Sequence, residues 1–160
     1  MPEMSETAGR SYVDVEQAQT VVADVMALAG DGPLFMLNLL RFKPIADYAD
    51  APHLAPAKQI SGAAATGHYM KLCEDRLKAR ADQISFLGRC GPFMIGPPDE
   101  HWDAVLIIRR PSLTSMISGM SDDDYPTRIA PHRAAALADS RLLPMVEGGP
   151  GLDLFGANPA

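Results

Sequence analysis

Two short runs of the sequence are apolar on both faces of a strand, and they constrain the fold more than any other feature. The first is residues 34–43, LFMLNLLRFK, and the second is residues 102–110, WDAVLIIRR. Successive side chains of a strand point to opposite faces. An apolar residue at nearly every position therefore predicts a strand that is covered on both sides. We expect both runs to lie inside a sheet with a layer on each face.

The remaining elements follow from apolar spacing and from the positions of glycine and proline. Apolar residues at helical spacing predict helices over residues 14–29, 66–80, 113–120 and 131–138. Two weaker strands are predicted over residues 85–95 and 141–147. Gly88 and Gly91-Pro92 break the first of these and predict a bulge or two short strands, and Pro144 places the second at a sheet edge or at a bulge. After the first helix the order is βαββαβ, the ferredoxin-like α+β arrangement with an extra N-terminal helix.

The second face of the apolar strands has no cover in such a fold, because the helices lie on one side of the sheet. A second copy of the chain is the simplest cover, since closed homodimers are the commonest oligomers. We therefore expect a dimeric α+β barrel built from a single domain, residues 1–160. Its core is expected over about residues 34–147, with flexible tails at 1–12 and 148–160.

Charge and composition exclude several classes of protein. Fourteen Lys and Arg against 20 Asp and Glu give a net charge of -6, which argues against a general nucleic-acid binder. No apolar run approaches the roughly 20 residues that span a bilayer, and the polar N-terminus differs from a signal peptide. Cys73 and Cys90 imply no disulfide framework. Together these features predict a cytoplasmic protein with no membrane partner.

Several stretches resemble one family. IGPPDEHWDAVLIIRRPS (residues 95–112) and YPTRIAPHRAAALADSRLLPM (residues 125–145) resemble the DUF1330 family of the dimeric α+β barrel superfamily. MLNLLRFK resembles the family's opening strand, and SGAAATGHYMKL its first helix region. Arg109-Arg110 departs from the family, which often has an aromatic residue before this proline, and residues 88–91 hold fewer glycines. The family has no established reaction, so the resemblance implies a fold and a dimer.

Tyr125, His132 and Arg133 form the densest group of polar candidates. His132 and Arg133 fall in the first turn of a predicted helix, where free N–H groups and the helix dipole favour anions. His132 titrates near neutral pH and is therefore the catalytic candidate, as acid or base. The alternative is structural: His132 is a partly exposed helix residue, and Arg133 pairs with a carboxylate such as Asp124 or Asp139.

Other ligand-binding candidates lie on the predicted strands and the second helix. Asn38 sits among leucines, where a buried amide must be hydrogen-bonded, either to backbone or to a ligand. Tyr69 is either a core residue with a bonded hydroxyl or a phenol that reaches a pocket. Asp103 either forms an ion pair or contacts a ligand, and Arg109 is a second candidate to hold an anionic group.

Metal and cofactor sites are not predicted. His53, His68, His101 and His132 share no helix-face spacing, and the cysteines form no CxxC pair. No glycine-rich phosphate-binding motif occurs. Some superfamily relatives bind haem, and by that analogy the ligand would be His53, His68 or His132.

Two functions from different classes follow. The first is a small enzyme that resembles cofactor-independent monooxygenases or isomerases and acts on a small organic molecule, of which an anion is one kind, between sheet and helices. The second is a homodimer that binds a metabolite without catalysis or has a structural role. The long connection over residues 44–65 is expected to be either mobile or functional, for instance as a lid.

Overall fold

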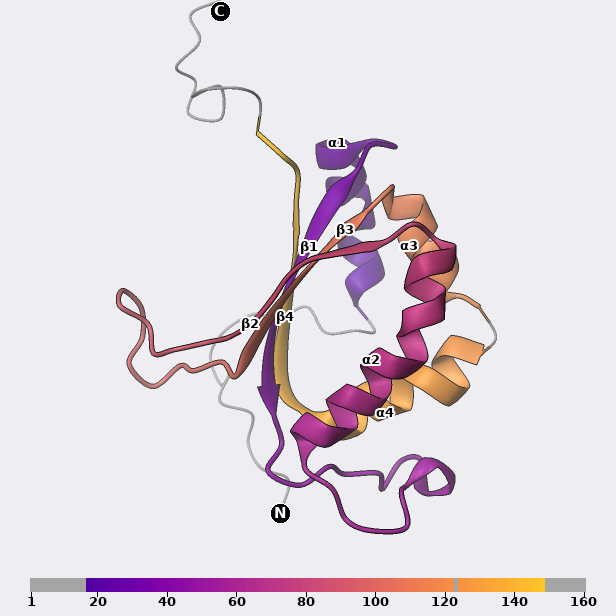
Figure 1. Cartoon of the computed structure of the whole chain (residues 1–160). Helices are drawn as coiled ribbons and strands as arrows, with labels where there is room; N and C mark the ends of the chain where they lie inside the picture. The colour runs from indigo at the N-terminus through magenta and orange to yellow at the C-terminus, as the bar shows by residue number, and fades with distance from the viewer. Residues whose placement is uncertain (1–16, 123, 149–160) are drawn as a thin grey trace, which may run out of the picture.

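The computed structural model describes residues 17–122 and 124–148, which form an antiparallel sheet with helices on one side (Figure 1). Chain order and sheet order together match the predicted ferredoxin-like α+β fold with an extra N-terminal helix. The sheet has the order β2-β3-β1-β4 and stays open. Its strands are β1 (Leu34–Phe42), β2 (Gln83–Arg89), β3 (Ala104–Arg110) and β4 (Leu137–Met145). The helices are α1 (Val22–Ala29), α2 (Gly62–Ala79), α3 (Leu113–Met120) and α4 (Ala130–Ala136).

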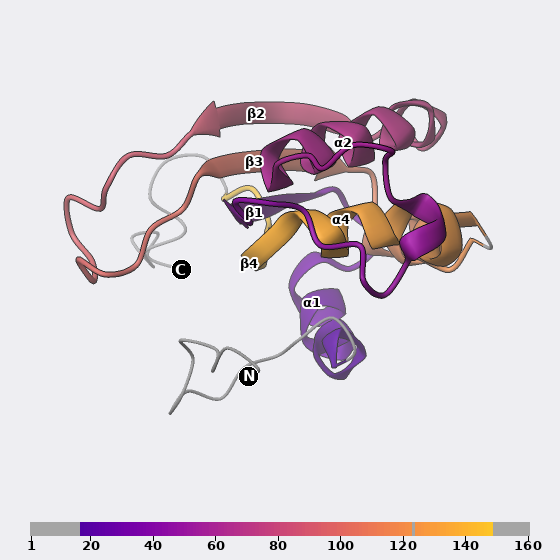
Figure 2. The same ribbon diagram turned by 90° about the horizontal axis from the view of Figure 1, so that it is seen from below.

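Two apolar clusters pack the helices against β1 and against the connection that follows β1. In the first, Leu34 and Met36 of β1 pack with Leu113 of α3, and α1 closes over them. The second joins Tyr48, which follows β1, to Ala65 of α2 and to the end of α4. The two views of the ribbon show α2 and α4 side by side over the sheet (Figures 1 and 2).

The opposite face of the sheet is apolar and uncovered within the described part of the chain. Register places Phe86, Ile107, Leu37 and Leu143 in one row across all four strands. Residues directly opposite one another in antiparallel strands share a face. The outer members are open to solvent: Phe86 is 53% exposed and Leu143 is 54% exposed. We call this surface the open face.

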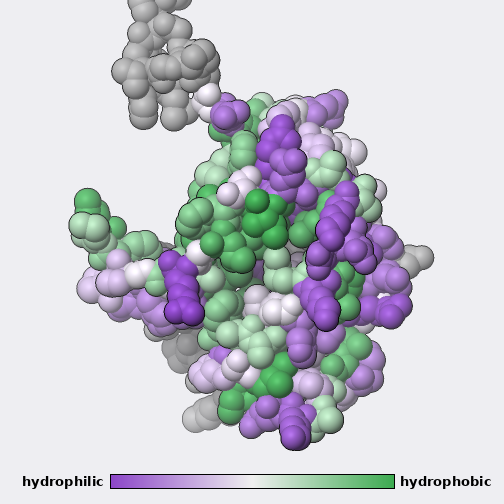
Figure 3. All heavy atoms as spheres, in the orientation of Figure 1, coloured by the Kyte–Doolittle hydropathy of each residue, from purple (hydrophilic) through white to green (hydrophobic). Residues whose placement is uncertain are grey.

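A long loop leaves the body between β2 and β3 (Figure 1). It spans residues 90–103, and Met94 near its tip is fully exposed. The space-filling view shows apolar surface over β2 and again on this loop (Figure 3). The sequence predicted a strand continuing to residue 95, but β2 ends at Arg89. The bulge lies between Ile84 and Phe86 instead of at Gly88.

Other predicted boundaries shift for local reasons. Helix α2 begins at Gly62, four residues before the predicted start, because the Ser61 hydroxyl accepts the amide of Ala64 at 3.1 Å and caps the helix. The Thr66 hydroxyl instead donates to the carbonyl of Gly62 inside the helix.

The last helix and strand meet without a loop. Helix α4 ends at Ala136 and β4 begins at Leu137, so the predicted helix end at 138 and strand start at 141 were wrong. The edge position predicted from Pro144 is confirmed. In the N-terminal helix, a 3-10 turn over Ala18–Val21 precedes α1, and the predicted start near residue 14 lies outside the described residues.

The connection from β1 to α2 is anchored at both ends and in its middle. The amide of Lys43 donates to the carbonyl of Ala136 at 2.8 Å, and the amide of Gly62 donates to the carbonyl of Lys43 at 2.9 Å. Between them, the amide of Asp47 donates to the carbonyl of Ala135 at 2.8 Å. These bonds hold the segment that the sequence marked as mobile or functional against the end of α4.

Candidate functional site

A pair of tyrosines joins α2 to the segment before α4. Tyr69 on α2 and Tyr125 have their hydroxyl oxygens 2.9 Å apart. Tyr125 opens a π-helix, Tyr125–Ile129, a wide turn that is often found at functional sites. Burial raises the pKa of Tyr69 well above its ordinary value, with a further contribution from Tyr125. Tyr69 therefore keeps its proton at physiological pH.

Arg133 lies on the side of α4 that faces β4. Its guanidinium donates to the Ser140 hydroxyl at 3.2 Å, and its charge lowers the pKa of Tyr69 against the larger effect of burial. Among the residues that the structure describes, no carboxylate lies within ion-pair distance of Arg133. The carboxylates named as alternatives pair elsewhere. Asp124 lies 3.8 Å from Arg128, and Asp139 lies 2.6 Å from Arg141.

Asn38 lies on the helix-covered face of a central strand and is still partly exposed, whereas Met36 and Leu40 beside it on that face are buried. Its amide nitrogen donates to the carbonyls of Met36 and Leu106, both at 3.2 Å. Within the described chain, the amide oxygen has no hydrogen-bond donor. Part of Asn38 is therefore accessible to solvent. The backbone contacts agree with the structural alternative, and the free oxygen leaves a ligand role open.

His132 points away from this group toward the β1–α2 connection. Its Nδ1 lies 2.8 Å from the Tyr48 hydroxyl, and the two rings meet edge to face with centroids 5.5 Å apart. Burial lowers the pKa of His132 below its ordinary value, and the charge of His68 lowers it further. The structure therefore separates the catalytic candidate from Tyr125 and Arg133, which the sequence grouped with it.

Asp103 and Arg109 have other surroundings. The Asp103 carboxylate accepts the amide of Phe42 at 2.7 Å, and the Asp103 amide donates to the carbonyl of Leu40, so this residue joins β3 to the end of β1. Arg109 is paired with Phe35 on the open face. Neither residue shares a hydrogen bond with the tyrosine pair or with Arg133 in the described structure.

A second polar group, which the sequence analysis missed, lies where α2 ends. Arg110 and Asp82 form an ion pair at 2.7 Å with the Asp82 side chain only 1% exposed. Arg76 donates to the carbonyl of Gly119 and to Asp122, both at 3.0 Å, and its guanidinium lies 5.8 Å from the ring centre of Tyr125. No local pattern in the sequence indicates these pairs, because Asp82 and Arg110 lie 28 residues apart and Arg76 and Asp122 lie 46 residues apart.

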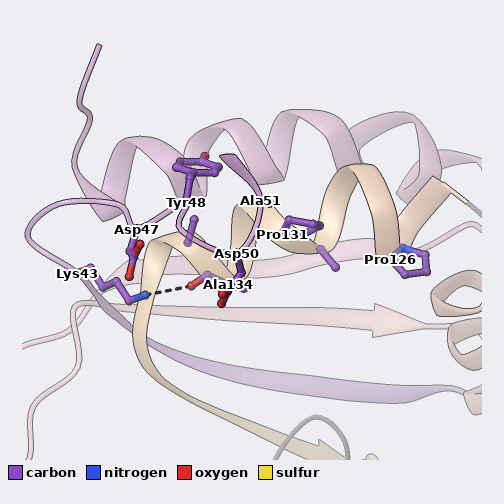
Figure 4. A pocket seen from close by; sticks show the side chains of 10 residues that line it. Lys43, Asp47, Tyr48, Asp50, Ala51, Pro126, Pro131 and Ala134 are labelled. Carbon is purple, nitrogen blue, oxygen red and sulfur yellow. Dashed lines mark hydrogen bonds between the residues drawn. The ribbon is translucent and has the colours of Figure 1, made fainter. Parts of the chain in front are cut away.

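A hollow of about 300 Å³ lies outside the layer between sheet and helices. It is bounded by the connection after β1 on one side and by the π-helix and α4 on the other (Figure 4). In the sequence, the length of this connection is the feature that distinguishes it. The lining residues are Lys43, Asp47, Tyr48, Asp50, Ala51, Pro126, Ala130, Pro131, Ala134 and Ala135.

The described residues contain no group of three side chains placed to hold a metal ion. In the same part of the chain, no helix has the length and apolar content to cross a bilayer. Within it, Cys73 and Cys90 are free thiols.

Comparison with known proteins identifies structural relatives without a known activity. No family model matches the chain, so the DUF1330 resemblance stays a prediction, and no curated protein matches it. A crystal structure of methylated RPA0582 protein is 31% identical with a TM-score of 0.72, covering 88% of this chain and 98% of that one. A structure of RPA0582, a protein of unknown function from Rhodopseudomonas palustris, is 30% identical with the same TM-score, covering 88% and 100%. The chain therefore belongs to the family of RPA0582.

Proposed function

We propose that this protein is a homodimer that binds a small organic anion between its sheet and its helices. The observation that carries the proposal is the guanidinium of Arg133. It is partly buried, and in the described structure its hydrogen-bond partner is a neutral hydroxyl. Guanidinium groups bind carboxylates through two parallel hydrogen bonds. A carboxylate ligand would supply the negative charge that the described residues do not place within ion-pair distance of Arg133.

The tyrosine pair supports an anion at the same place. In the pair, one hydroxyl donates to the other, and the remaining phenolic proton can be donated to a ligand or to the Cys73 thiol, which also hydrogen-bonds with Tyr69. Burial keeps Tyr69 protonated and therefore a donor. Arg133 with one phenolic donor matches the two oxygens of a carboxylate, and the amide oxygen of Asn38 suits a hydroxyl or N–H group on the ligand.

Binding is favoured over the monooxygenase- or isomerase-like activity that superfamily relatives suggest. An acid or base must come within hydrogen-bond reach of the proton it transfers. His132 is bonded to Tyr48 on the other side of α4. The residues that form the proposed anion site therefore supply hydrogen-bond donors and a positive charge but neither an imidazole nor a carboxylate.

The open face supports the proposed dimer, in which two sheets pack into an α+β barrel. Its row of Phe86, Ile107, Leu37 and Leu143 is an exposed apolar patch of the kind that marks a protein interface. Ile107→Glu would bury a charge in the middle of the interface and should give monomers or aggregates in sedimentation velocity. An unchanged dimer of this variant would contradict the geometry. Both cysteines are free, which supports the proposed cytoplasmic location.

Titration with sodium benzoate, followed in ¹H–¹⁵N NMR spectra, tests the anion site. Arg133→Met should weaken benzoate at least ten-fold, because a charged hydrogen bond contributes about 1.5–3 kcal/mol. Arg128→Met is the matched control, since the Arg128 side chain is 73% exposed and pairs with Asp124 on the surface. His132→Gln should leave the affinity within a few-fold. Equal binding of neutral benzamide, or equal losses in the two arginine variants, would refute the proposal.

A further inference from the structure

The hollow outside α4 has one charged end and one apolar end. Lys43, Asp47 and Asp50 stand around one end, and Pro131 and Pro126 form the other (Figure 4). Tyr48 lies between the two carboxylates in sequence and contributes to the same wall. A lining of this kind suits a ligand that has a charged head and a compact apolar body.

The charge available to a ligand is negative. The Lys43 ammonium donates to the carbonyl of Ala134 at 3.4 Å, near the end of α4, where cations are stabilised by the helix dipole. Asp47 uses one carboxylate oxygen to accept the amide of Ala49 at 2.9 Å. In the described chain neither Asp47 nor Asp50 has a cation within ion-pair distance. The hollow is therefore lined by two carboxylates and by one ammonium group, and that ammonium already donates a hydrogen bond to a backbone carbonyl.

The wall that carries these carboxylates is held in place. Asp47 donates its amide to the carbonyl of Ala135, and the Tyr48 hydroxyl is fixed at 2.8 Å from His132. Tyr48 is only 9% exposed and packs on Ala65 of α2. The hollow is therefore preformed, and a ligand would not have to order the connection in order to bind.

We propose that this hollow is a second ligand site, which takes a small organic ammonium ion with an apolar body. The ammonium group would lie between the carboxylates of Asp47 and Asp50, beside Tyr48, whose aromatic ring attracts cations. The apolar body would lie along Pro131 and Pro126. This site is separate from the proposed anion site on the other side of α4, and neither proposal depends on the other.

Three probes with one apolar body and different heads test the proposal: phenethylamine, 2-phenylethanol and 3-phenylpropionate. Each is titrated into the full chain at pH 7 and low salt, with ¹H–¹⁵N spectra as the readout. Phenethylamine should shift the amides of residues 47–51 and 134–135 with millimolar affinity. The alcohol should bind up to about five-fold more weakly, since an exposed ion pair contributes up to about five-fold in affinity.

Asp50→Asn removes one charge at nearly constant shape and should weaken phenethylamine about five-fold. Asp99→Asn is the matched control, because Asp99 is exposed on the β2–β3 loop and carries the same charge. On the unchanged chain, 0.5 M NaCl should weaken phenethylamine by screening the carboxylates. The proposal is overturned if the alcohol binds as well as the amine, if 3-phenylpropionate binds best, if both aspartate variants lose equally, or if these amides do not shift.

Discussion

Replacing Gly62 by alanine should destabilise the fold far more than any other small change in α2. Gly62 is the first residue of α2, and its amide donates to the carbonyl of Lys43. A Cβ at this position would collide with the carbonyl oxygens of Lys43 and Ala136 and stand 2.7 Å from the Lys43 nitrogen. All of these atoms are backbone, so no side chain can move aside. The end of β1, the start of α2 and the end of α4 would have to separate.

The magnitude follows from what the separation breaks. Two backbone hydrogen bonds are lost or stretched, Gly62 to Lys43 and Lys43 to Ala136, at about 1 kcal/mol each. Overpacking typically adds about 1–3 kcal/mol. Alanine recovers up to about 1 kcal/mol through its helix propensity. The expected net loss in the free energy of unfolding is therefore about 2–4 kcal/mol.

Urea unfolding followed by circular dichroism measures this loss, and Gly67→Ala supplies the control. Gly67 lies in the middle of the same helix, and a Cβ there would meet nothing within 4 Å. Gly67→Ala should therefore stabilise the protein by about 0.5–1 kcal/mol. If Gly62→Ala changes stability by less than 1 kcal/mol, or behaves like Gly67→Ala, the packing of the three segments is not as described.

Three further predictions concern buried polar groups. Burial lowers the pKa of His132 in the folded state, so the unfolded chain takes up the proton first as the pH falls below about 6.5, and the stability of the fold should decline from there. In His132→Asn, the urea midpoints measured at pH 7.5 and at pH 5.5 should therefore lie closer together than in the unchanged chain. An unchanged difference between the two midpoints would contradict this. Arg110→Met leaves the buried Asp82 carboxylate without its partner and should cost about 3–5 kcal/mol in thermal unfolding. Adding Asp82→Leu should restore most of that loss, and a double variant no better than the single one would refute the explanation. Tyr69→Phe removes the hydrogen bond to Tyr125 and should cost about 1 kcal/mol in urea unfolding, whereas Tyr125→Phe at no cost would show that the pair is not formed.

The fold was predictable because the spacing of the apolar residues indicates which segments form strands and which form helices. The runs that became β1 and β3 are apolar at nearly every position, and the structure pairs them in the middle of the sheet. The boundaries that failed depend on competition between similar signals. Ser61 and Thr66 are both suitable helix caps, and only the contacts of the folded chain decide between them.

Candidate residues of the site were predictable from the sequence, but the contacts between them were not. Tyr69, Tyr125 and Arg133 were candidates from the sequence, but the pairing of two tyrosines 56 residues apart depends on how α2 meets the π-helix. His132 was grouped with Arg133 because the two are neighbours in sequence. Its partner Tyr48 lies in a connection without any periodic pattern, so no local signal indicated it.

The π-helix before α4 has a consequence for how this chain tolerates insertions and deletions. His132 and Arg133 are adjacent, and an α-helix turns about 100° per residue, so one reaches the β1–α2 connection while the other reaches β4. The wide turn over Tyr125–Ile129 sets the rotational phase at which α4 begins. Loss of one residue from that turn would leave a regular α-turn, whereas loss of one residue from α4 itself before His132 would rotate the later side chains of α4 by one helical step. The imidazole and the guanidinium would then leave their present surroundings together, although neither residue had changed.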